Sequence, residues 1–263
     1  MVGMGLCDEN DLTRRAISLA ATCGDVFVEE HSIRLVDVNP KAISKALGRR
    51  VTVLDRKKIK NGTQILQAAQ KGEAALLCGG DPGFAITHFE LVIRAKKMGL
   101  DVRWIHAPTI FPATTALIGL SPYKFGRITV LTPHKGDMVS TTPLEQMAMN
   151  RRTGLHTLIL LEPEISDGPP KHLLIPEALD MLERMEGKTG LSTLKEDTLM
   201  CGIARAGSID PLVACGTMAQ LRKVEWGGPL HTMVLPGKLD PIEVKGLVVL
   251  AGADERMLGQ VSL

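Results

Sequence analysis

Apolar and polar positions alternate between two patterns along the 263-residue chain. Short runs of consecutive apolar residues, typical of strands buried on both faces, are separated by stretches in which apolar residues recur at helical spacing. The pattern predicts a parallel sheet covered by helices on both faces in the first part of the chain. Its strands are expected at residues 2–6, 25–29, 51–54, 74–78 and 101–105.

Helix starts are marked by capping residues and prolines. Thr13 precedes a helix, Asn39-Pro40 provides a cap and a first-turn proline for a helix through residue 47, and Asp240-Pro241 opens the last helix. Glu243, at the third position of that last helix, completes a capping box. Further helices are expected at residues 63–71 and 88–98 and around the apolar face formed by residues 175–185.

The pattern changes after residue 105. Residues 106–126 contain three prolines and read as a linker with a short helix, and strands are expected again at 128–131, 155–161, 199–204 and 232–235. The simplest prediction is an α/β protein of two α/β domains, residues 1–110 and residues 111–263.

Composition narrows the classes of function. Lys and Arg total 31 against 29 Asp and Glu, so the charge gives little reason to bind nucleic acid or an acidic membrane. Basic runs such as residues 56–60 are interpreted as solvated faces, with partner docking as the weaker alternative. Aromatic residues make up only 3%, which argues against a base-stacking surface.

The cysteines and the apolar runs predict a cytoplasmic location. Five cysteines, an odd number without a C-x-x-C pair, indicate reduced and buried thiols. No run approaches the roughly 20 apolar residues of a membrane span. The first residues lack a secretory pattern, because the acidic residues 8–9 follow almost at once.

Several familiar sites are excluded by their spacing. The G-x-G at residues 3–5 is followed by Asp8 where a dinucleotide fingerprint needs its third glycine, and the Gly-Lys pair at 237–238 is followed by Leu239 where a P-loop needs a hydroxyl. No G-x-S-x-G is present. The histidines show neither metal-binding spacing nor a cysteine partner nearby in the sequence, so no metal site is expected.

Three loops follow expected strands, at residues 3–6, 78–84 and 106–110. Ligands bind beyond the carboxyl ends of strands in open parallel sheets, and glycine lets a ligand approach the backbone closely. Asp81 is the only charged residue of its loop and is suited to accept hydrogen bonds from a ribose or an ammonium group. An ordinary turn with a capping aspartate explains one such loop equally well, whereas three loops together favour a shared ligand site.

Motifs along nearly the whole chain resemble those of the diphthine synthase family, within the tetrapyrrole methylase superfamily. In chain order they are V-G-M-G-L-C-D-E at 2–9, G-G-D-P at 79–82, H-A-P-T-I at 106–110, Y-K-F-G at 123–126, G-L-H-T-L at 154–158, A-R-A-G-S at 204–208 and P-G-K-L at 236–239. The G-D-P turn is shared by the superfamily, whereas H-A-P-T-I, Y-K-F-G and P-G-K-L distinguish the family.

The resemblance implies two α/β domains with S-adenosyl-L-methionine in the cleft between them. It implies methylation of the amino group of a modified histidine (the diphthamide precursor) on translation elongation factor 2, giving diphthine and S-adenosyl-L-homocysteine. A homodimer is implied, without nucleic acid, membrane or metal, and no catalytic residue is identified. The cofactor contacts it implies are Leu6, Asp81, Phe84, Thr109, Ile110, Leu161, Ala206 and His231.

Other interpretations stay open at this point. Leu161 and Ile110 would be core residues in any such fold, and His231 fits a buried histidine whose hydrogen bonds are satisfied. A tetrapyrrole methyltransferase of cobalamin synthesis would share the G-D-P turn and the two domains. A nucleotide-binding regulatory or scaffold protein without catalysis is the alternative of another class.

Overall fold

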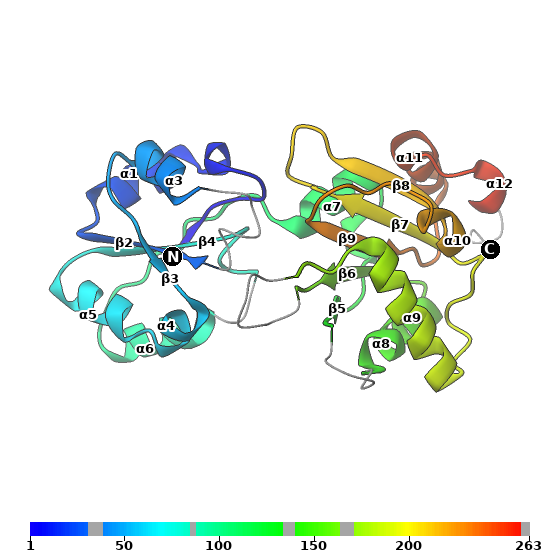
Figure 1. Ribbon diagram of the computed structural model, residues 1–263, viewed down its shortest axis with the longest axis horizontal. Coiled ribbons are helices and arrows are strands. Elements are labelled where there is room, and N and C mark those ends of the chain that lie inside the picture. Colours follow the sequence, from blue (N-terminus) through cyan, green and yellow to red (C-terminus); the bar gives the residue numbers. More distant parts are fainter. Residues whose placement is uncertain (31–38, 85–87, 134–139, 164–170, 259–263) are drawn as a thin grey trace. The chain divides into compact units, whose positions relative to one another are not determined.

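The computed structural model describes residues 1–30, 39–84, 88–133, 140–163 and 171–258. The chain divides into two compact units, Met1–Ile110 and Phe111–Leu263, and each has its own sheet and its own hydrophobic core (Figure 1). Both units combine helices with a sheet, which confirms the predicted α/β fold class. In the described part of the chain, no helix has the length and apolar character needed to cross a membrane.

The sheet of the first unit is parallel throughout, in the order β1-β4-β2-β3. Its strands are β1 (Val2–Gly3), β2 (Asp25–Glu29), β3 (Thr52–Leu54) and β4 (Ala74–Cys78). Its helices are α1 (Arg14–Thr22), α3 (Pro40–Leu47), α4 (Arg56–Asn61), α5 (Thr63–Lys71) and α6 (Phe89–Lys97).

Side chains of the first sheet alternate between two buried faces. Val26 and Val28 of β2 pack in one core with α1 and α3, whereas Phe27 between them packs in another with α4, α5 and α6. Figure 1 shows these two groups of helices on opposite faces of the sheet. Capping fixes two of the helix starts as predicted, because Thr13 accepts from the Ala16 amide and Asn39 from the Lys41 amide.

Two predicted strands of the first unit differ from the structure. The expected strand 2–6 is reduced to β1, because the Asp11 carboxylate accepts the amides of Leu6 and Cys7 and turns the chain away from the sheet. The expected strand 101–105 is wrong. Only Ile105 forms a bridge, to Val2, because so short a β1 offers no further partner on this side.

The sheet of the second unit is mixed, in the order β5-β6-β9-β7-β8, and only β5 and β6 run parallel. Its strands are β5 (Thr129–Leu131), β6 (Thr157–Leu161), β7 (Leu199–Ala204), β8 (Leu212–Thr217) and β9 (His231–Leu235). Its helices are α7 (Ile110–Ile118), α8 (Thr142–Arg152), α9 (Ile175–Thr189), α10 (Met218–Leu221), α11 (Pro241–Ala251) and α12 (Glu255–Leu258).

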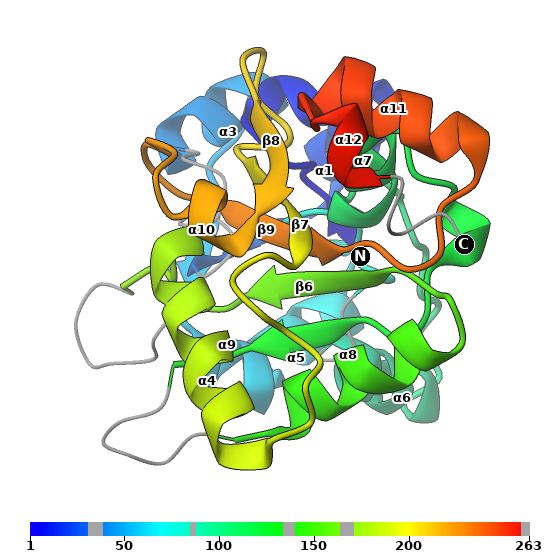
Figure 2. The same ribbon diagram turned by 90° about the vertical axis from the view of Figure 1, so that its right-hand side faces the viewer.

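Helices cover both faces of this second sheet (Figure 2). One core contains buried residues of α8, α9 and α10, and the other contains residues of α7, α11 and α12. Strand β8 and helices α4 and α8 are not predicted from the sequence. β8 begins with the apolar run Leu-Val-Ala-Cys at 212–215, so its sequence does carry a strand signal, which the prediction does not use.

Candidate functional site

The three loops at residues 3–6, 78–84 and 106–110 meet at the carboxyl edge of the first sheet. The Gly3 amide donates to the Ile105 carbonyl at 2.9 Å, and the Gly80 amide donates to the Gly5 carbonyl at 2.7 Å. A Cβ on Gly3 would lie 2.6 Å from both the Ala107 Cβ and the Gly80 oxygen. Any side chain at position 3 would therefore force the loops apart, so glycine is required by their close approach.

The turn after β4 exposes backbone. Gly80 has a φ of 64°, and the Thr109 hydroxyl lies 3.5 Å from the position that its Cβ would occupy. Phe84, whose amide donates to the Asp81 carbonyl, presents an aromatic ring that is 38% exposed. Ile110 follows Thr109 as the half-buried first residue of α7. A ligand at this edge would contact mainly backbone, one hydroxyl and one ring.

Asp81 joins two of the loops. Its Oδ1 accepts the Gly83 amide at 2.8 Å, and its Oδ2 accepts the Ala107 amide at 3.1 Å and lies 2.8 Å from His106 Nδ1. A carboxylate has about four acceptor positions, so three are already in use. From the sequence, Asp81 was expected to accept hydrogen bonds from a ligand. In the structure its carboxylate also holds two loops together.

The environment keeps Asp81 ionised. Partial burial would raise the pKa of its carboxyl group, but the hydrogen bonds from Gly83, Ala107 and His106 outweigh burial and hold that pKa below its ordinary value. The side chain of Asp81 is 13% exposed, against 72% for His106. The group is therefore a shielded hydrogen-bond acceptor at neutral pH and is unsuited to act as an acid.

Asp11 plays a corresponding part in the first loop, and sequence reasoning did not identify it. Its Oδ2 accepts the amides of Leu6 at 2.7 Å and Cys7 at 2.9 Å. With its amide engaged, Leu6 is left with its carbonyl and its side chain for a ligand. A short acidic side chain that closely follows a glycine turn is the sequence signal for such a clamp.

The three predicted site residues of the second unit gather at one edge of its own sheet. In the β7–β9 ladder Ala204 pairs with His231, and Ala206 follows two residues later. In the β6–β9 ladder Leu160 pairs with Thr232, which places Leu161 opposite His231 by continuation of the register. Leu161 and His231 therefore lie side by side at the ends of their strands, although 70 residues separate them, and Ala206 lies two residues beyond the Ala204–His231 pair.

The His231 ring is fully engaged inside the second unit. Nδ1 accepts the Ile175 amide at 3.2 Å, Nε2 lies 3.0 Å from the Gly228 carbonyl, and the ring centroid is 6.2 Å from that of Trp226. Burial lowers the pKa of His231 despite the hydrogen bond to Gly228, so the ring stays neutral. Both ring nitrogens have hydrogen-bond partners, as expected from the alternative interpretation of His231 as a buried structural histidine. Only the face of the ring and the backbone are left to contact a ligand.

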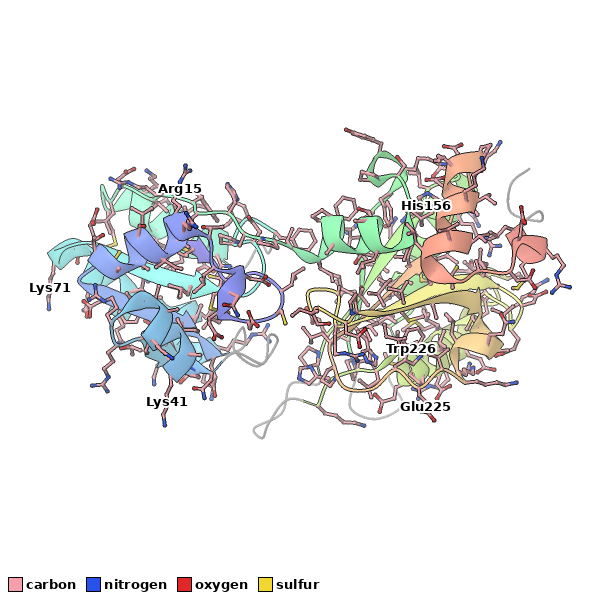
Figure 3. All side chains as sticks on the ribbon, turned by 90° about the horizontal axis from the view of Figure 1, so that it is seen from above. Arg15, Lys41, Lys71, His156, Glu225 and Trp226 are labelled. Carbon is pink, nitrogen blue, oxygen red and sulfur yellow. The ribbon has the colours of Figure 1, made fainter. Side chains whose placement is uncertain are left out.

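Two motifs that distinguish the family meet at a buried carboxylate. Glu243 of α11, 1% exposed, accepts the amides of Ser121 at 3.0 Å and Asp240 at 2.9 Å and also binds Lys124 Nζ. Its Oε1 lies 3.0 Å from Nε2 of His156, which Figure 3 labels in the second unit. Lys124 belongs to Y-K-F-G, and Asp240 directly follows P-G-K-L. These motifs therefore contribute to the core of the second unit.

A cavity of about 310 Å³ lies elsewhere in the first unit. It lies at the amino ends of the strands, where its lining includes Met1 and Glu73. Ligands of parallel sheets bind beyond the carboxyl ends of the strands, so this cavity is not the candidate site.

Comparison with known proteins agrees with the motifs. Residues 1–200 match the family model of the Tetrapyrrole (Corrin/Porphyrin) Methylases. The diphthine synthase of Methanocaldococcus jannaschii is 34% identical over 95% of this chain and 97% of its own. That of Methanothermobacter thermautotrophicus is 35% identical over 100% and 99%. A crystal structure of diphthine synthase matches with a TM-score of 0.86 and 28% identity, covering 98% of this chain and 97% of that one.

The tetrapyrrole methylase type of fold is thereby confirmed. Since the family model covers most of the chain and the relatives match almost all of it, the chain belongs to the tetrapyrrole methylases, within them to the diphthine synthases, and is an S-adenosylmethionine-dependent methyltransferase.

Proposed function

We propose that this chain methylates the amino group on the side-chain arm of the modified histidine of translation elongation factor 2, in the cytoplasm, giving diphthine. The observation that carries the proposal is the close meeting of the three loops at Gly3, Gly80 and Ala107. It supplies a preformed, glycine-lined edge beyond the strands of a parallel sheet, where such folds bind their ligands.

The residues at the two sheet edges suit S-adenosylmethionine. In the first unit Leu6, Asp81, Phe84, Thr109 and Ile110 belong to the converging loops or directly follow them. In the second unit Leu161, Ala206 and His231 share one edge. We propose that both sets contact the cofactor. Bare backbone, an exposed aromatic ring and small apolar side chains match an adenosine group and a sulfonium better than they match a phosphate.

The bound cofactor supplies an electrophilic methyl group on a sulfonium. The protein must align the attacking nitrogen with that methyl group and exclude water, which is a task of positioning. A neighbouring sulfonium charge lowers the pKa of the attacking amine, because like charges disfavour its protonated form. Asp81 provides an anchored anion that fixes the turn after β4. The thioether product would be S-adenosylhomocysteine.

Mass spectrometry of the elongation factor tests the proposal. Factor that carries the unmethylated precursor is incubated with enzyme and S-adenosylmethionine, beside a matched sample whose target histidine is replaced by alanine. The modified peptide is expected to gain mass in steps of one methyl group, and the alanine control is expected to gain none. An unchanged factor, together with methylation of a cobalamin precursor, would establish the tetrapyrrole alternative instead.

We also propose that the enzyme acts as a homodimer, as the family resemblance implies. Sedimentation equilibrium of the full chain at micromolar concentration is expected to give twice the chain mass of 28.4 kDa. A single species at the chain mass would contradict the dimer and leave the methylation proposal intact.

A further inference from the structure

Three side chains with metal-binding chemistry lie together in the first unit. Glu29 ends β2, Cys78 ends the neighbouring β4, and His88 directly precedes α6. Their ligand atoms all lie within 4.8 Å of one another, and His88 Nε2 is 3.4 Å from Glu29 Oε2. Cys78 is fully buried, and the side chains of His88 and Glu29 are 5% and 12% exposed.

The His88 ring is the unusual member of this cluster. Neither of its ring nitrogens has a hydrogen-bond partner within the described part of the chain. A buried polar group without a partner costs about 1–3 kcal/mol, so a buried imidazole normally has one. The His106–Asp81 pair of the same unit closes to 2.8 Å, whereas His88 and Glu29 stop at 3.4 Å. A simple histidine–carboxylate hydrogen bond therefore does not account for the cluster.

A zinc ion fits the donor set. Zinc binds thiolate, imidazole and carboxylate at about 2.0–2.3 Å, so tetrahedral ligand atoms stand about 3.3–3.8 Å apart. The cluster needs to contract by at most about 1 Å to reach this spacing.

We propose that Glu29, Cys78 and His88 form a binding site for a divalent zinc ion. Binding forms three metal–ligand bonds and releases the Cys78 proton to solvent, without any change of oxidation state. Cys78 directly precedes the Gly79–Pro82 turn, so the ion fixes the base of that turn. Local spacing in the sequence gives no sign of this site, because Cys78 and His88 are ten positions apart and Glu29 lies on another strand.

Metal titration of the full chain, stripped with a chelator, tests the site. Zinc alone is expected to bind at one equivalent per chain, measured by competition with a chromophoric chelator. Cobalt(II) alone is expected to give a thiolate-to-metal absorption band in the near ultraviolet. Cys78→Val, which keeps the size of the buried side chain, should abolish that band. Glu29→Gln and His88→Gln should each weaken zinc binding at least tenfold.

Cys23→Ala is the matched control, because Cys23 is also buried in the first unit but lies outside the cluster. It should leave zinc affinity and the cobalt band unchanged. The proposal is overturned if stripped protein takes up no stoichiometric zinc, or if the band survives in Cys78→Val variants whose circular dichroism matches the parent. The titration uses neither cofactor nor elongation factor, so its failure would not affect the methylation proposal.

Discussion

In the cofactor site that we propose, Asp81 acts through the two loops that its carboxylate joins. In Asp81→Asn one side-chain oxygen can still accept the Gly83 amide, but the new amide group cannot accept from Ala107. We expect the affinity for S-adenosylmethionine to fall about tenfold or more, because a hydrogen bond to a charged group contributes roughly 1.5–3 kcal/mol. Isothermal titration calorimetry measures this change.

The control for Asp81 is Asp101→Asn. Asp101 is exposed in the same unit, at 74% for its side chain, and its carboxylate pairs with Lys96. It should leave cofactor affinity within the experimental error. Equal affinity for the parent and for Asp81→Asn would remove Asp81 from the cofactor site.

Glu243 is a buried carboxylate that binds four partners within the second unit. Burial would raise the pKa of its carboxyl group, but hydrogen bonds from Lys124 and from the Asp240 and Ser121 amides lower it from 4.5 to about 2. A shift of this size corresponds to about 3 kcal/mol. We expect Glu243→Gln to lower the free energy of unfolding by about that amount at pH 7, measured by urea denaturation.

The same shift fixes the sign of the pH dependence. A carboxyl group with a lowered pKa in the folded state stabilises the fold above its unfolded pKa of about 4.5, and this contribution is lost as the pH falls toward 2. The stability difference between the parent and Glu243→Gln should therefore be constant above about pH 5 and shrink below it. Exposed Glu225, replaced by glutamine, is the control and should change little at any pH.

Asp81 and Glu243 show which properties of single residues the sequence can predict. Asp81 stood out as the single charge in a glycine turn, which needs only local information. Its partners His106 and Ala107 lie 25 and 26 residues away, so nothing in the sequence pairs them with it. Glu243 was predicted as a helix-capping residue, and the structure confirms the capping box with Asp240. Its buried contacts to residues 119 and 87 positions away depend on the tertiary fold.

At the scale of elements, α7 and α11 approach through two glycines. A Cβ on Gly246 of α11 would lie 2.7 Å from the Gly119 carbonyl oxygen. Gly246→Ala should therefore destabilise the protein by about 1–3 kcal/mol through overpacking, although alanine is the better helix former. Gly187→Ala in α9 meets nothing within 4 Å and should instead stabilise it by about 0.5–1 kcal/mol.

Denaturation midpoints of the two variants measure this contrast. Opposite signs are expected for the same substitution in two helices of the same unit. A neutral or stabilising Gly246→Ala would mean that α7 and α11 separate without cost.

Elements were predictable where their signals are local. β2, β4, α3 and α5 have the bounds that apolar runs and caps predict. The failures follow from pairing: residues 101–105 have strand character, but β1 is too short to pair with more than Ile105. β8, conversely, was not predicted, although it begins with the apolar run 212–215 and forms a full ladder with β7.

At the scale of the whole molecule, the two units have separate cores, and each contains one of the two tryptophans. Trp104 packs against Phe89 in the first unit, and Trp226 is buried at 3% exposure in the second. With Trp104→Phe or Trp226→Phe as the background, fluorescence reports on one unit at a time. We expect Glu243→Gln to lower the urea midpoint reported by Trp226 more than that reported by Trp104. Equal shifts would show that the chain unfolds as a single cooperative system.

The boundary between the two units, between Ile110 and Phe111, lies within the proline-containing segment that follows residue 105. Sequence alone marks that segment, because prolines and a change of pattern are local signals. The sequence could not predict that Leu161, Ala206 and His231 share one end of the second sheet, because this depends on the order of its strands.

The buried carboxylate of Glu243 has a consequence for how enzymes of this kind are recognised. Y-K-F-G and P-G-K-L, two of the three motifs by which the sequence was assigned to the family, are tied to Glu243 through Lys124 and Asp240. A duplicated gene that lost methyl transfer but kept its fold would still need them for solubility and expression. Genome surveys that rely on these motifs therefore count folded chains. If the proposed site is correct, a survey that aims to count working enzymes should also score the glycines at positions 3 and 80.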